Sequence, residues 1–350
     1  MIGSGLVQLK FPAFLRERLP RPRLCLAWIA VGLINWGMVA AVPAQDNAAP
    51  VTQAEPLATP TLHLATNLVQ IPVLILSPKG VRLPAPIATE RFEVRLSGGP
   101  AFQPKYVRVE GDDPLDLAVV VDTRVLQDNL LQRVDDGIAE LAPEFLHAGD
   151  HVSIYVIDCS TVSAVENVPA DRARLKKAAG AALDGWTKRL TQKKAQPCDI
   201  NTHLWDILAY VTDRLFKHPG WHAILAVTDG TNKKGKFSAD ALARMAQNDQ
   251  VTILGLDPAL TTGVYRRGRP GDSAEEFGEV CGESGGLWLG LYDKTVAERL
   301  SWFTQILRDR YVVEFPRPPN LKPGNTEMTI KIEGMEAFIR PAGDLVPVTE

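Results

Sequence analysis

The feature that most constrains the fold is a continuous apolar run, Leu117-Ala-Val-Val-Val-Asp122, that ends on an acidic residue. A run of this kind is typical of a strand buried on both faces of a sheet. A second run, from Ala223 to Val227, is followed by Thr228-Asp229-Gly230. Because ligands of open α/β sheets bind at the carboxyl ends of the strands, both runs predict carboxylates at a functional edge.

Strand and helix patterns alternate from residue 117 onwards. Strands are expected near 117–122, 152–158, 161–165, 222–228, 251–256 and 286–291, and helices near 129–141, 171–184, 203–216, 239–247, 274–281 and 294–309. This alternation predicts an α/β domain, doubly wound, with a mainly parallel sheet flanked by helices.

Short β patterns flank this domain on both sides. They lie near 69–75, 92–96 and 106–109 before it, and near 311–315, 328–332 and 337–340 after it. Each flank has too few strands to be stable alone. We therefore expect the flanks, residues 66–112 and 310–345, to pair into one small β-sandwich with the α/β domain, residues 113–309, inserted between them.

The N-terminal region has the pattern of an export signal. Four arginines between residues 16 and 23 precede an apolar stretch over 24–42, and Val42-Pro43-Ala44 offers small residues for cleavage. We expect residues 1–44 to be a signal peptide, with an uncleaved membrane anchor as the alternative, and 45–65 to be a disordered linker. The protein is then exported to the periplasm, the cell envelope or the extracellular space.

The net charge and the cysteine spacing argue against two classes of protein, nucleic-acid binders and zinc proteins. The formal net charge of −3 gives no general reason to expect nucleic-acid binding. Cys159, Cys198 and Cys281 follow the predicted signal, and their spacing does not fit a zinc site. A disulfide between Cys159 and Cys198 is one pairing to test, while Cys281 fits a buried apolar position.

The order Asp122, Thr202, then Thr228-Asp229-Gly230 resembles the metal-binding edge of a von Willebrand factor A (VWA) domain. The flanking pattern, with Phe92-Glu-Val94, Gly98-Gly99, Gly285-Gly286 and Arg308-Asp-Arg310-Tyr311, is similar to the exported VWA-related proteins abundant in Acidobacteria. The resemblance covers about residues 66–345. It implies a non-enzymatic binding or adhesion role, with Asp122, Thr202 and Asp229 as ligands of a divalent cation.

This chain departs from the family pattern beside the first aspartate. The family places serines two and four residues after it, where this sequence has Arg124 and Leu126. Three interpretations follow. Arg124 replaces the metal and bridges Asp122 and Asp229; or a weak Mg²⁺ or Mn²⁺ site persists; or the aspartates merely cap loops in a decayed site. The cofactor expectation is thus none, or a weakly bound divalent cation.

Basic loops follow the predicted strands. Such a positive edge would attract a protein or an anionic envelope polymer, whereas no nucleic-acid reader motif accompanies the charge. A membrane is expected as a partner only if the N-terminal segment stays uncleaved. The residues expected to bind are Arg124, Lys233, Lys234, Lys236, Arg266, Arg267 and Arg269.

Two rival functions remain. A hydrolase could use Ser284, in Gly282-Glu-Ser-Gly-Gly286, or a metal-bound water at Asp122 and Asp229. However, Ser284 follows a helix and precedes a strand, the reverse of a nucleophile elbow. A structural scaffold of a cell-envelope assembly is the second rival. The acidic group Asp112, Asp113 and Asp116 is expected to be a solvated linker.

Overall fold

The structure is a computed structural model. It describes residues 7–10, 68–78, 80–81, 83, 86–124, 128–158, 161–191, 202–233, 235–258, 273–290, 296–322, 324 and 326–347.

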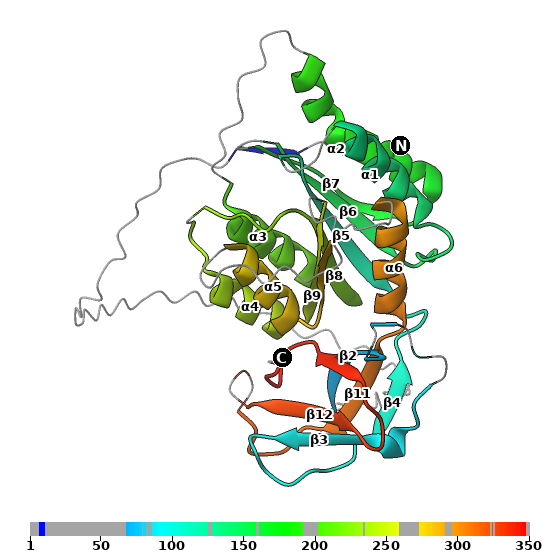
Figure 1. The fold of residues 1–350 in the computed structure, drawn as a ribbon, viewed down its shortest axis with the longest axis vertical. Coiled ribbons are helices and arrows are strands. Elements are labelled where there is room, and N and C mark those ends of the chain that lie inside the picture. The colour runs from blue at the N-terminus through cyan, green and yellow to red at the C-terminus, as the bar shows by residue number, and fades with distance from the viewer. Residues whose placement is uncertain are drawn as a thin grey trace, which may run out of the picture. The chain divides into compact units, whose positions relative to one another are not determined.

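A seven-stranded sheet forms the centre of the α/β domain (Figure 1). Its strand order is β1-β7-β6-β5-β8-β9-β10, and the strands from β6 to β10 run parallel. The chain moves from β5 to β6 on one side and later returns to β8 on the other, so the order reverses between β5 and β8. The strands are β1 (Val7–Lys10), β5 (Leu115–Asp122), β6 (His151–Asp158), β7 (Thr161–Pro169), β8 (Trp221–Val227), β9 (Val251–Asp257) and β10 (Trp288–Gly290).

Helices cover both faces of this sheet. On one face lie α1 (Asp128–Glu140), α2 (Arg172–Thr191) and α6 (Val296–Arg308); on the other lie α3 (Leu204–Phe216), α4 (Ala239–Asn248) and α5 (Ser273–Glu283) (Figure 1). Alternate side chains of β5 enter the two cores: Val119 and Val121 face α1, α2 and α6, whereas Ala118 and Val120 face α3, α4 and α5. Every residue of β5 is therefore buried, which explains its uninterrupted apolar run. The predicted doubly wound α/β fold is confirmed.

The two flanks of the chain form the small β-sandwich that the sequence predicted. One sheet has the order β13-β2-β11-β4, and the other pairs β12 with β3. Val69 and Ile71 of β2 share a core with Phe92 of β3 and Phe315 of β11. The elements are β2 (Leu68–Leu76), the 3-10 turn η1 (Thr89–Arg91), β3 (Phe92–Leu96), β4 (Tyr106–Val109), β11 (Tyr311–Pro316), β12 (Met328–Ile332) and β13 (Phe338–Pro341).

The segments that lead into and out of the α/β domain lie side by side. The Glu110 amide donates to the Arg310 carbonyl at 2.8 Å, and the Gly111 amide donates to the Arg308 carbonyl at 2.9 Å. Arg308 also donates to the Asp113 carbonyl at 2.7 Å and pairs with the buried Asp150. These contacts join the end of α6 to the start of β5 and to the sandwich strands β4 and β11.

The N-terminal region is described only at β1, which pairs antiparallel with β7 from Thr161 to Ala164. The rest of the predicted signal and linker lies outside the described residues. Among the residues that were described, no helix is long and apolar enough to cross a membrane.

Candidate functional site

Asp122 ends β5 beside the position where the strand order reverses. Its side chain is fully buried, and both carboxylate oxygens accept hydrogen bonds. Arg124 Nε donates to Oδ1 at 2.9 Å and Arg124 Nη2 donates to Oδ2 at 2.5 Å. The Thr228 hydroxyl at the end of β8 donates to Oδ2 at 3.1 Å. Arg124 thus holds Asp122 through the planar, two-pronged geometry that suits a carboxylate.

Arg124 is itself nearly buried, with 9% of its side chain exposed. Burial alone would lower the pKa of Arg124, but the hydrogen bond and the charge of Asp122, together with the charge of Asp229, raise it. The guanidinium is therefore a permanent cation at this edge. Its Nη2 also reaches the Thr231 carbonyl at 3.5 Å, which lies in the loop after β8.

Asp229 has a different role from Asp122. It is half-buried, and its Oδ1 accepts the Thr231 amide at 2.9 Å. Between the two aspartates, Arg124 donates hydrogen bonds to Asp122, and Asp229 acts on Arg124 through its charge. The guanidinium is therefore bonded directly to Asp122, while its interaction with Asp229 is electrostatic.

Thr202 lies just before α3, and it is buried with 2% of its surface exposed. Its carbonyl accepts the Lys233 amide at 2.8 Å. Its hydroxyl has no hydrogen-bond partner among the residues described. The loop after β8 thus brings the three predicted metal ligands, Asp122, Thr202 and Asp229, to one edge of the sheet. It carries Asp229 itself, and it is bonded to Thr202 through the Lys233 amide. Thr228, which precedes Asp229, is bonded to Asp122.

A divalent cation does not fit the donor set at this edge. Magnesium takes six oxygen ligands in near-octahedral geometry. Both oxygens of Asp122 are already bonded to Arg124 and Thr228, and the adjacent guanidinium would repel a second cation. Among the described residues, Asp229 and the Thr202 hydroxyl remain as oxygen donors, so a cation here would have to compete with the guanidinium and take most of its ligands from water.

The basic residues predicted to bind a partner differ in their exposure and pairing. Lys233 and Lys236 are exposed, and neither forms an ion pair with a carboxylate among the described residues. Arg124 is neutralised by Asp122. The remaining predicted cations, Lys234, Arg266, Arg267 and Arg269, lie outside the described residues.

A second arginine–aspartate pair at this edge was missed from the sequence. Asp158 ends β6, the strand next to β5, and Arg189 near the end of α2 holds its carboxylate at 2.6 to 3.1 Å. A helix predicted only to residue 184 would not have reached this position. The signal that could have revealed the pair is the acidic residue at the end of a second buried strand.

The rival catalytic residue Ser284 is buried, with 1% exposed. Its hydroxyl donates to the Cys281 carbonyl at 3.1 Å and accepts the Ile253 amide at 3.0 Å. These bonds tie the end of α5 to β9. Cys281 is buried as expected, and burial raises the pKa of its thiol. The predicted cysteine pair, Cys159 and Cys198, lies outside the described residues.

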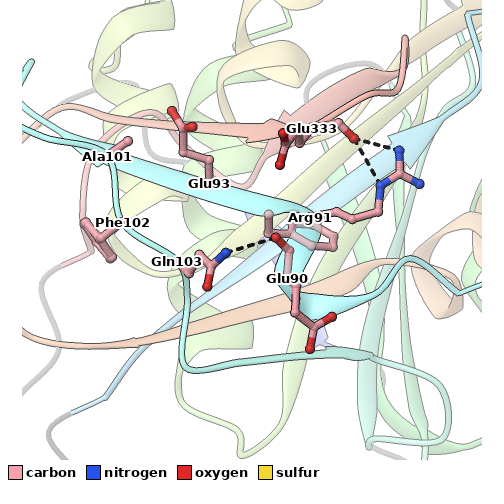
Figure 2. Close-up of a pocket in the computed structure, with 8 residues that line it drawn as sticks. Glu90, Arg91, Glu93, Ala101, Phe102, Gln103 and Glu333 are labelled. Atoms are coloured by element: carbon pink, nitrogen blue, oxygen red, sulfur yellow. Dashed lines mark hydrogen bonds between the residues drawn. The ribbon is translucent and has the colours of Figure 1, made fainter.

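The β-sandwich carries a hollow of about 230 Å³ beside η1 and β3 (Figure 2). Arg91 donates to the Glu333 carbonyl at 2.6 and 3.0 Å, and Gln103 donates to the Glu90 carbonyl at 3.2 Å. Figure 2 shows these polar groups turned to the backbone rather than converging on one point. The hollow is smaller than most ligand pockets, so it does not compete with the sheet edge as the candidate site.

Comparison with known proteins gives structural neighbours only. No protein-family model matches the chain, and no curated protein matches it. The neighbours include the conserved hypothetical protein BatB from Bacteroides thetaiotaomicron, with a TM-score of 0.37, 18% identity, and coverage of 55% of this chain and 97% of BatB. An aerotolerance-related membrane protein from Bacteroides fragilis gives a TM-score of 0.36, 14% identity, and coverage of 55% and 98%.

A third neighbour is the vWF domain of the type V pili tip protein Mfa5 from Porphyromonas gingivalis. Its TM-score is 0.39 with 10% identity, and the match covers 55% of this chain and 95% of the Mfa5 domain. These values are too low to carry residue roles from the neighbours to this chain. The chemistry of the site therefore rests on its own geometry.

Proposed function

We propose that this protein is an exported, non-enzymatic VWA-like binding module that attaches to a negatively charged macromolecule through the carboxyl edge of its sheet. One observation carries the proposal: the Arg124 guanidinium is bonded to both oxygens of Asp122, at the place where the resemblance predicts a metal ion. Because the guanidinium occupies the place expected for a metal ion, binding to a partner need not depend on a metal. The exposed Lys233 and Lys236 then supply charge that a partner can reach.

The first test is calorimetric titration with Mg²⁺ and with Mn²⁺. The natural protein is compared with a double variant, Arg124→Ser and Leu126→Ser, which restores the hydroxyl residues of the family pattern. We expect no heat of binding from the natural protein and measurable binding by the double variant. Micromolar binding by the natural protein would show that the site is metal-dependent and would overturn the metal-free mechanism.

The second test concerns the partner. Poly-L-glutamate serves as the acidic probe, with and without a chelator. We expect the natural protein to bind the probe equally well with and without the chelator. The double charge reversal Lys233→Glu and Lys236→Glu should abolish this binding. Lys322→Glu with Lys331→Glu is the matched control, because both lysines are exposed on the β-sandwich and change the net charge equally. Equal loss in both variants would show that total charge, not this edge, governs binding.

A structural scaffold is the second candidate, favoured by one observation on the β-sandwich. Strand β4 ends the four-stranded sheet and exposes 51% of Tyr106 and 38% of Val109. A scaffold that assembles through this strand would keep its self-association or envelope association when Lys233 and Lys236 are reversed. Loss of association in Tyr106→Ser, with the lysine variant unaffected, would favour the scaffold over the binding module.

A further inference from the structure

The loop between β8 and α4 is fastened at many points to the start of α3. We call residues 231–233 and 235–237 the anchored loop. The Asp206 carboxylate in the first turn of α3 accepts the amides of Lys236 at 2.8 Å and Phe237 at 2.9 Å. The Trp205 amide donates to the Asn232 side chain at 3.2 Å.

Further bonds fix the first half of the same loop. The Lys233 amide donates to the Thr202 carbonyl at 2.8 Å, and the Asn232 amide donates to the Ser273 hydroxyl at 3.3 Å. Gly235 lies directly against Asp206, because a Cβ at this position would be 2.5 Å from its Oδ2. The backbone of the anchored loop is thus held before any partner arrives, which reduces the entropy lost on binding.

The exposed side chains of the anchored loop combine positive charge with an apolar ring. Lys233 and Lys236 are exposed, and Phe237 exposes 36% of its surface. Phe237 is one of a few large apolar residues exposed among those described. The amides of both lysines and of Phe237 are bonded to residues 202–206, so the three side chains leave a backbone that is fastened to one place, the start of α3.

Two carboxylates bind the backbone of the anchored loop and offset part of its positive charge. The Asp206 carboxylate is occupied by the Lys236 and Phe237 amides, and Asp229 is half-buried and bonded to the Thr231 amide. The start of α3 adds the partial positive charge of a helix N-terminus. The loop therefore exposes two lysines and one aromatic side chain to a partner, with Asp240 exposed three residues further along the chain.

We infer that the anchored loop recognises an acidic protein segment that carries an apolar side chain beside its carboxylates, and that Phe237 is the specificity-determining residue. The inference rests on the proposed function and narrows it. An anionic polysaccharide would use the lysines but would have no side chain to bury against Phe237. A protein segment would use both, and buried aromatic contacts are enriched among the residues that dominate interfaces.

Two synthetic peptides test this inference with the full chain. One has a phenylalanine between runs of glutamate, and the other has alanine in its place. Their affinities are measured by fluorescence anisotropy at low and at high salt. We expect the phenylalanine peptide to bind about tenfold more tightly, a preference that persists at high salt because apolar contacts are not screened.

Three variants separate the contributions. Phe237→Ala should remove the preference between the peptides while keeping the lysine-dependent affinity. Phe216→Ala is the matched control, because Phe216 is also exposed, at 55%, but lies at the other end of α3. Lys233→Ala with Lys236→Ala should weaken both peptides equally and reduce the salt dependence.

The outcomes distinguish the two claims. Equal binding of both peptides that still needs the lysines would overturn the role of Phe237 and keep the proposed function. A preference that survives in Phe237→Ala would also overturn that role. No binding of either peptide, or binding that the lysine variant leaves unchanged, would overturn the inference and the proposed function together.

Discussion

Glu110 and Arg310 form a doubly hydrogen-bonded ion pair with almost no contact with solvent. Arg310 Nε and Nη2 donate to the two carboxylate oxygens of Glu110 at 2.9 and 3.0 Å. The Arg310 side chain exposes 2% of its surface and the Glu110 side chain 0%. Arg310 Nη1 also donates to the Thr252 hydroxyl of β9 at 2.5 Å. The pair therefore joins the ends of β4 and α6 to the α/β sheet.

Removing one partner of this pair should be strongly destabilising. Glu110→Ala leaves a buried guanidinium unpaired, so we expect a loss of about 3–5 kcal/mol in the free energy of unfolding, measured in urea. Lys176→Ala provides the contrast, because Lys176 pairs with Asp135 and Asp136 at the surface and should change stability by less than about 1 kcal/mol. Similar losses in both variants would show that the buried pair has no special importance.

Asp122→Ala should also act first on stability. It leaves the nearly buried Arg124 without its carboxylate, so we expect a loss of about 3–5 kcal/mol on unfolding in urea. The double variant Asp122→Ala with Arg124→Ala should recover part of this loss, because it removes the unpaired cation. An Asp122→Ala protein that keeps its melting temperature but loses tight magnesium binding would contradict this account.

Thr202→Val replaces a buried hydroxyl that has no partner among the described residues with a methyl group of similar size. We expect the free energy of unfolding in urea to rise by about 1 kcal/mol, because the cost of burying an unsatisfied group disappears. The control is Thr212→Val, since the buried Thr212 hydroxyl donates to the Leu208 carbonyl at 2.9 Å and its loss should destabilise. If both variants lose stability, the Thr202 hydroxyl has a partner in the native protein.

Asp249 predicts a pH-dependent effect at the end of α4. Burial, and then the charge of Asp213, raise the pKa of Asp249 from 3.8 to about 6. Because the folded pKa is raised, its stabilising contribution is present at low pH and is lost as the pH rises through about 6. The charged form also opposes the helix dipole at this C-cap position.

Asp249→Asn should therefore raise the melting temperature at pH 8 and leave it nearly unchanged at pH 4. Asp240→Asn is the matched control in the first turn of the same helix, where a negative charge is favourable. That variant should lower the melting temperature at pH 8. Equal shifts of the same sign in both would disprove the explanation based on helix position.

The sequence predicted most of the fold because its signals are local. The run before Asp122 and the alternation of strands with amphipathic helices follow from burial on both faces of one sheet. The pairing of the two flanks followed from stability, since neither has enough strands alone. Within the site, Arg124 and Asp122 are two residues apart, so their proximity was visible in the sequence.

Features that depend on distant partners were not predictable in this way. Asp116 was expected in a solvated linker, but it lies in β5 with 4% exposed and pairs with His218, which is far along the chain. The last turns of α2 were also missed, although Trp186 continues the apolar spacing of the helix and is buried; the Arg189 there is held by the distant Asp158. A charged residue in a strand gives no sign of its partner until the sheet is assembled.

The pairing of β4 with β11 makes the α/β segment from β5 to α6 the loop of a single antiparallel hairpin. During synthesis, β2, β3 and β4 emerge long before their partners β11, β12 and β13. A loop as long as a domain closes quickly only if the domain folds first and brings its ends together. Because the bonds between Glu110 and Arg310 and between Gly111 and Arg308 hold the two ends of the inserted domain together, we expect this domain to fold before the sandwich that surrounds its ends.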